Sequence, residues 1–174
     1  RAEEVLHHVA RDEKPALLLG IMDREKPERT MIFTNTKAEA EKVAKLLEHH
    51  GVRARGITGN LEQSRRLKLM EEFKSGELPV MVATDVASRG LHIDAVSLVV
   101  NWDLPQDPED YVHRIGRTAR AGAAGDAVSF GCDLDALDPI YRRRFRSGLC
   151  RGLSTDSPTG EQGVGPRATL RMLS

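Results

Sequence analysis

Short apolar runs alternate with amphipathic segments between residues 29 and 131, and this alternation restricts the folds open to the chain. Several of the apolar runs are continuous, as in parallel strands that are covered on both faces. The pattern predicts an α/β fold of three layers, with a mostly parallel central sheet and helices on both faces. The strands are expected at Thr30–Thr34, Arg53–Ile57, Val80–Ala83, Ser97–Val100 and Ala127–Phe130.

The segments between these strands carry helix boundary signals. Thr36 begins a capping-box pattern, and Gly51 is expected to end the helix that follows it. A second helix is expected from about Leu61 to Ser75, with Leu67 among its inward residues. A third opens at Asp107-Pro108, where an acidic cap precedes a proline of the first turn.

The flanking segments divide the chain into three expected parts. Residues 1–28 are expected to form a helical segment, broken near Pro15, that leads into the domain at residues 29–141. Residues 142–174 lose periodicity, are rich in Gly, Ser, Thr and Pro, and hold seven Arg against two acidic residues. They are interpreted as a disordered basic tail. An RNA-binding arm and a shift of reading frame near Tyr141 are the alternatives.

Composition excludes several classes of protein. The 26 basic and 26 acidic residues balance, so any nucleic acid is expected to bind in a local groove rather than over a generally basic surface. No apolar run approaches the roughly 18 residues of a membrane helix, so no membrane association is expected. The two cysteines form no CxxC motif and no ligand spacing for a metal occurs, which favours a reducing cytoplasm and no metal site.

Polar stretches follow the expected strands directly, and in a parallel sheet such stretches meet at one edge. Arg114, Arg117 and Arg120 occur at spacing three, with no carboxylate between them. A surface salt-bridge cluster is therefore disfavoured, and convergence on a phosphate is favoured. No GxxxxGK[ST] motif occurs, so the chain is not expected to hold the β- and γ-phosphates of a nucleotide by itself.

Five segments, in this order, resemble motifs of the C-terminal RecA-like domain of DEAD-box RNA helicases. The resemblance covers about residues 25–131, and HRIGRTAR together with GLHID is most similar to the bacterial RhlB-like subgroup. The segments are Met31–Lys37, Gln63–Arg66, Val82–Leu91, Asn101–Pro105 and Tyr111–Arg120.

The resemblance implies a two-domain ATPase in which an N-terminal RecA-like domain supplies the phosphate loop and binds ATP with Mg²⁺. Arg117 and Arg120 would then act as arginine fingers on the γ-phosphate. His113 and Arg114 would complete the catalytic set by linking to the partner domain. Asp85 and His92 would be further ATP contacts. The RNA backbone would lie along Thr36, Gly59, Gln63, Arg66, Thr84 and Gly90.

Two positions depart from the family pattern. His92 stands where many members have the Asp that meets the ATP ribose, and Ala119 replaces a frequent Gly.

Without its partner domain the chain is expected to be inactive. A protein of an RNA-degradation complex is a possible partner. The alternatives are a stand-alone RNA- or protein-binding module without catalysis, and a DNA helicase or other translocase of superfamily two.

Overall fold

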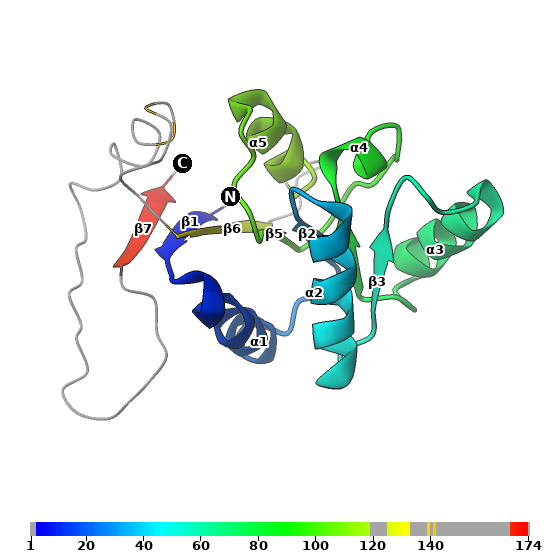
Figure 1. Ribbon diagram of the computed structural model, residues 1–174, viewed down its shortest axis with the longest axis horizontal. Coiled ribbons are helices and arrows are strands. Elements are labelled where there is room, and N and C mark those ends of the chain that lie inside the picture. Colours follow the sequence, from blue (N-terminus) through cyan, green and yellow to red (C-terminus); the bar gives the residue numbers. More distant parts are fainter. Residues whose placement is uncertain (1–2, 119–124, 133–138, 140, 142–167, 174) are drawn as a thin grey trace.

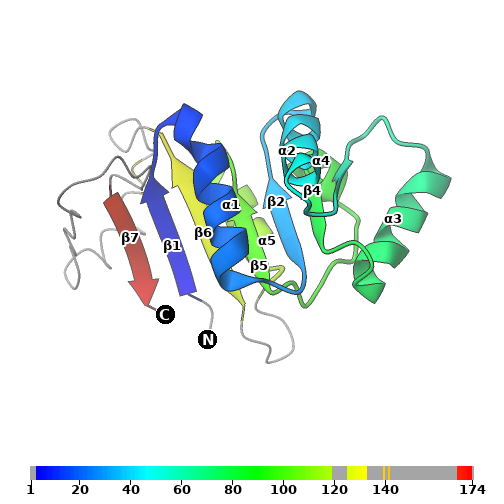
Figure 2. The ribbon, with the colours of Figure 1, turned by 90° about the horizontal axis from the view of Figure 1, so that it is seen from below.

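The computed structural model describes residues 3–118, 125–132, 139, 141 and 168–173. Within this part of the chain, seven strands form one sheet in the order β3-β4-β2-β5-β6-β1-β7, and Figure 2 shows most of them side by side. All neighbouring strands are parallel except β7, which is antiparallel to β1. The strands are β1 (Glu3–His8), β2 (Thr30–Phe33), β3 (Ala54–Ile57), β4 (Val80–Ala83), β5 (Leu98–Asn101), β6 (Asp126–Gly131) and β7 (Ala168–Leu173).

Helices cover both faces of the sheet. α1 and α2 pack over one face, on side chains that include Ile32 and Val100. α3 and α4 pack over the other face, on side chains that include Met31 and Phe33. Figure 1 shows α1 below the strands, with α4 and α5 above them. The helices are α1 (Lys14–Glu25), preceded by a 3₁₀ turn at Arg11–Glu13, then α2 (Lys37–His49), α3 (Gln63–Ser75), α4 (Asp85–Ser88) and α5 (Pro108–Ile115).

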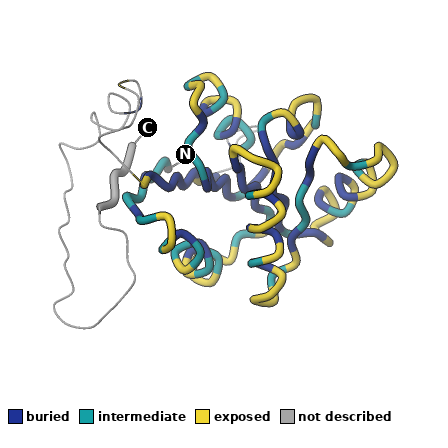
Figure 3. Tube along the Cα trace, viewed as in Figure 1, coloured by how far each residue is buried: buried dark blue, intermediate teal, exposed yellow. Residues whose placement is uncertain are grey.

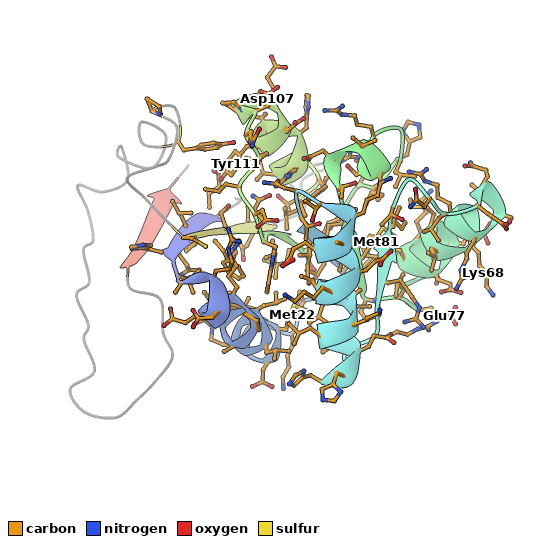
Figure 4. The ribbon with its side chains drawn as sticks, in the orientation of Figure 1. Met22, Lys68, Glu77, Met81, Asp107 and Tyr111 are labelled. Atoms are coloured by element: carbon orange, nitrogen blue, oxygen red, sulfur yellow. The ribbon has the colours of Figure 1, made fainter. Side chains whose placement is uncertain are left out.

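The central strands are buried along their whole length. Every residue of β2, β4 and β5 is buried, and the sheet forms the dark centre of the tube in Figure 3. Continuous apolar strands suit this position because neither of their faces meets water. Figure 4 shows the same contrast, with Met81 in the interior and Lys68 and Glu77 toward the outside around α3. The predicted three-layer α/β fold is thus confirmed.

The boundary signals of the helices are largely confirmed. The Thr36 hydroxyl accepts a hydrogen bond from the Glu39 amide, and the Asp107 carboxylate caps α5 by accepting one from the Glu109 amide. The expected inward position of Leu67 is wrong, because its side chain is 55% exposed. The buried stripe of α3 runs instead through Leu69, Met70 and Phe73.

The prediction of a helix across the first residues is wrong for Glu3–His8, which forms β1. This strand pairs in parallel with β6, and its Leu6 is fully buried. Pairing with β6 on one side and β7 on the other overrides local helix preference here. Pro15 does not interrupt a helix either; it lies in the first turn of α1, where proline is tolerated.

Part of the expected tail is also ordered differently from the prediction. Residues 168–173 form β7 beside β1, so the interpretation as disordered does not hold for them. Residues 142–167 lie outside the described part of the chain. The division into segments at residues 28 and 141 stays a prediction, although Tyr141 is 3% exposed and packs with Leu6 and Tyr111.

Two glycines offer a matched stability test. A Cβ at Gly125 would lie 2.7 Å from the Thr118 Cβ and 2.8 Å from its carbonyl oxygen, whereas a Cβ at Gly20 in α1 meets nothing within 4 Å. We expect Gly125→Ala to cost about 1–3 kcal/mol of unfolding free energy, through overpacking. Gly20→Ala should stabilise the chain by about 0.5–1 kcal/mol, because alanine favours the helix. Urea unfolding measures both, and equal effects of the two changes would contradict this account.

Candidate functional site

Residues that follow β2, β4 and β5 meet at the carboxyl edge of the sheet. The short helix α4 begins directly after β4, and the Thr84 hydroxyl caps it by accepting a hydrogen bond from the Ala87 amide. This cap leaves Asp85 as the first helical residue. The polar stretch that follows β4 therefore begins with one turn of helix.

Arg114 of α5 is the centre of this edge. Its side chain is 1% exposed, and all five of its N–H groups have an acceptor within the chain. Nε and Nη2 donate to the two oxygens of Asp85 at 2.7 and 2.6 Å. Nη1 donates to the Asn101 side chain at 3.2 Å and to the Asp103 carbonyl at 2.7 Å, and Nη2 also donates to the Asn35 side chain at 3.1 Å.

All five donors of Arg114 are engaged by residues of its own chain. The expected contact of Arg114 with polar groups of a partner domain stays a prediction. The guanidinium also lies 5.2 Å from the centre of the Phe33 ring, which adds a cation–π contact. Arg114 therefore ties together the ends of β2, β4 and β5. We call Arg114 and Asp85 the clamp.

Two tyrosines, Tyr111 of α5 and Tyr141, attach α5 to the rest of the domain. The Tyr111 hydroxyl donates to Glu4 of β1 at 2.9 Å, and its ring stacks edge-on against Tyr141 at 5.5 Å. The Tyr141 hydroxyl donates to the Pro105 carbonyl at 2.8 Å. Figure 4 shows Tyr111 and Asp107 on α5, above the strands. These contacts hold the helix that carries Arg114, which lies one turn after Tyr111 on the same buried side of α5.

A pocket of about 160 Å³ opens beside the clamp. Arg117 borders it and donates to the Leu91 carbonyl at 2.8 Å, which orients its guanidinium along the loop after α4. Arg89 borders it as well and pairs with Asp110 at 3.0 Å. The lining residues are Phe33, Asp85, Ser88, Arg89, Gly90, Asp110, His113, Arg114 and Arg117.

The predicted nucleotide contacts are distributed unevenly around this pocket. Arg117, His113 and Asp85 line it, and His113 is exposed, although Asp85 is already engaged by Arg114. His92 is exposed and is not among the lining residues. Arg120 lies outside the described residues, as does Ala119.

A second group of predicted residues comes together at the ends of β2 and β3. Thr36 caps α2, and the next residue, Lys37, donates through Nζ to the Asn60 side chain at 3.1 Å. A Cβ at Gly59 would lie 3.9 Å from the same Nζ, so the two loops are adjacent. The sequence reasoning did not select Lys37. Its position as the first residue after a helix cap was the available signal.

The remaining RNA candidates link this group to the pocket. Gln63 is the exposed first residue of α3, and Arg66, one turn later, donates to the Ala87 carbonyl of α4. Thr84 is buried and acts as a helix cap. Gly90 has φ +78°, a conformation that favours glycine. It lines the pocket and is not part of the group around Lys37.

Comparison with known proteins identifies the family. The model of the helicase conserved C-terminal domain matches residues 13–122. The chain belongs to this helicase C-terminal domain family. The ATP-dependent RNA helicase RhlB of Xanthomonas oryzae pv. oryzae is 52% identical over 137 residues, which are 79% of this chain and 24% of that protein. RhlB of Shewanella halifaxensis is 50% identical over 136 residues, 78% of this chain and 31% of that protein. The chain thus spans about a quarter of the first relative's length and a little under a third of the second's.

Solved structures place the helicase domain in the DEAD-box group. Escherichia coli DEAD-box protein SrmB, solved bound to regulator of ribonuclease activity A, matches with a TM-score of 0.69 and 33% identity, covering 74% of this chain and 76% of that chain. Saccharomyces cerevisiae Dbp5, solved with RNA and ADP BeF3, matches with a TM-score of 0.68 and 34% identity, covering 74% and 34%. The resemblance to the C-terminal RecA-like domain of DEAD-box helicases is confirmed.

The described residues of the helicase domain contain no helix that is both long and apolar enough to cross a membrane. They also contain no cluster of three or more His, Cys, Asp or Glu side chains suited to holding a metal ion.

Proposed function

We propose that this domain is the C-terminal half of an ATP-dependent RNA helicase. In this role it binds the RNA backbone and completes an ATP site whose phosphate loop belongs to an N-terminal RecA-like domain. The observation that carries the proposal is the pocket beside the clamp, where Arg117 is partly buried and oriented by the Leu91 carbonyl. A guanidinium held in this way is suited to stabilise charge on a transferring phosphoryl group.

The fit of the pocket to a phosphate rests on its donors. Arg89, His113 and Arg117 border it, and Gly90 allows close approach of the backbone. Arg120 is proposed as a second finger and His92 as the ribose contact, both from the resemblance alone. ATP, when bound, would supply the phosphoryl group. This chain would orient and stabilise that group.

The described residues do not fit a Mg²⁺ site of their own, because no cluster of candidate ligands occurs among them. We therefore assign the ion that accompanies ATP to groups of the other domain. Val86 of α4 is 71% exposed and Val112 of α5 is 50% exposed, and both adjoin lining residues of the pocket. Exposed apolar side chains at this position suit a surface that a second domain covers.

The RNA part of the proposal rests on the ends of β2 and β3. Lys37 offers a cation there, and Thr36 and Gly59 offer main-chain groups close to the start of α2. Gln63, Arg66, Thr84 and Gly90 extend this surface toward the pocket. Contacts of this kind reach phosphate and sugar and do not read base sequence.

The decisive experiment joins this chain to an N-terminal RecA-like domain that carries a phosphate loop. We expect RNA-stimulated ATP hydrolysis from the joined protein and none from the chain alone. Robust hydrolysis by the chain alone would contradict the half-site. RNA binding without any hydrolysis in the joined protein would favour the stand-alone binding module instead.

A salt titration tests the role of Lys37. If Lys37 neutralises one phosphate, binding of the Lys37→Ala variant should depend less on salt. The slope of log affinity against log salt should become less negative by about 0.7 for single-stranded RNA. Lys45→Ala is the matched control, because Lys45 is an exposed lysine two turns further along α2. Equal slopes for the wild type and both variants would contradict the assignment of Lys37 to the RNA-binding surface.

The cellular setting is proposed from the same likeness. We propose a cytoplasmic protein, and a partner from an RNA-degradation complex, because RhlB relatives share half of the aligned residues. Co-purification of the joined protein with such a complex is the test, and a protein recovered without any nuclease would contradict it.

A further inference from the structure

Lys14, a basic residue at the start of α1, is buried. Its side chain is 5% exposed, and Nζ donates to the Trp102 carbonyl at 2.6 Å and to Oδ1 of Asp103 at 3.2 Å. The ammonium also lies 5.6 Å from the centre of the Trp102 ring. Burial of an ammonium is costly unless its charge and donors are matched, so this pair is a specific feature of the fold.

Asp103 connects Lys14 to the clamp by two routes. Its Oδ2 accepts a hydrogen bond from the Asn35 amide at 3.0 Å, and the Asn35 side chain accepts one from Arg114. Its main-chain carbonyl accepts directly from Arg114 at 2.7 Å. Lys14 is not a lining residue of the pocket, yet only Asp103 and Asn35 separate it from the guanidinium.

Arg114 lies close enough to pair with either Asp85 or Asp103, so the charges of this network could be paired in two ways. Two cations, Lys14 and Arg114, face two carboxylates, Asp103 and Asp85. In the structure Lys14 pairs with Asp103, and both carboxylate oxygens of Asp85 are held by Arg114. Without the Lys14 charge, the Asp103 carboxylate would be uncompensated beside Arg114 and would compete with Asp85 for it, since partly buried charges are weakly screened.

We propose that Lys14 is a positioning residue for the pocket. By neutralising Asp103, it keeps Arg114 paired with Asp85 and thereby fixes the end of α5 against α4. The ordering of the clamp stands on this geometry alone. Its effect on ATP turnover rests on the proposed function.

Hydrogen exchange at the Arg114 side chain tests the proposal on the full chain. NMR measures how fast the Nε–H, which Asp85 accepts at 2.7 Å, exchanges with water. Lys14→Met keeps the length of the side chain and removes its charge, and we expect it to speed this exchange by roughly tenfold or more. Ile21→Val is the matched control, because Ile21 is a buried residue of the same helix outside the network. It should leave the exchange rate unchanged.

A second substitution separates charge from packing. If Lys14 acts by neutralising Asp103, then Asp103→Asn should restore slow exchange in the Lys14→Met background, because the competing charge is gone. Unchanged exchange in Lys14→Met would overturn the proposal. Failure of Asp103→Asn to restore slow exchange would overturn it too, because Lys14 would then act only through packing.

ATP turnover distinguishes this proposal from the proposed function. In the protein joined to its N-terminal domain, Lys14→Met should lower kcat by roughly tenfold with little change in the KM for RNA, and Asp103→Asn should restore it. If hydrogen exchange responds as expected and turnover does not, the positioning of the clamp stands and the role of the pocket in ATP hydrolysis is contradicted.

Discussion

Arg114→Met should lower the free energy of unfolding by about 3–5 kcal/mol, the cost of leaving one partner of a buried ion pair alone. The substitution keeps much of the side-chain volume and removes all five donors. Asp85 then carries an uncompensated charge, and Asn35 and Asn101 each lose a hydrogen bond. Urea unfolding of the full chain, followed by circular dichroism, measures the loss.

Two further variants identify the cause of that loss. Arg89→Met removes an exposed pair with Asp110 and should cost at most about 1 kcal/mol. Adding Asp85→Ala to Arg114→Met should cost less than the sum of the two single changes, because no partly buried carboxylate is then left without its partner. Additive costs would contradict the clamp as the source of the stability.

Arg117→Ala should lower the rate of ATP hydrolysis by about 10³-fold or more in the protein joined to its N-terminal domain, as removal of an arginine finger does. RNA affinity should stay within about twofold, because Arg117 borders the pocket and lies apart from the Lys37 group. Single-turnover hydrolysis and RNA binding at constant salt are the two measurements.

Two control variants test whether loss of any arginine, or loss of charge alone, would explain this result. Arg24→Ala removes an exposed arginine of α1, far from the pocket in the fold, and should leave turnover unchanged. Arg117→Lys keeps the charge but loses the planar fork, so it should recover only a small part of the activity. Full activity in Arg117→Ala would exclude Arg117 as a finger.

The central part of the fold could be predicted because its signals are local. Thr36, Gly76 and Asp107 mark helix ends through their own side chains or backbone conformation. The strands beside them are continuous apolar runs. β1 could not be predicted in the same way, because Glu3–His8 becomes a strand only by pairing with β6, far away in the sequence.

The site shows the same division between local and distant causes. Arg117 and His113 were selected from the sequence by their place in a motif, and both line the pocket. The contacts of Arg114 within the domain could not be predicted, since its acceptors follow β2 and β4 or lie at the end of β5, and no local pattern reveals that they converge. Lys14 was missed for the same reason, because its partner Asp103 lies 3.2 Å away in space but on a different element.

The position of β1 has a consequence for how the chain folds. Glu4 pairs with Ala127 on one side and with Met172 on the other, so β1 lies between two strands from the opposite end of the sequence. Pairings this distant in sequence slow folding, because a long loop must close before the contact forms. We therefore expect β2, β3, β4 and β5 to assemble first during synthesis. β1 would remain unpaired until nearly the whole domain has left the ribosome.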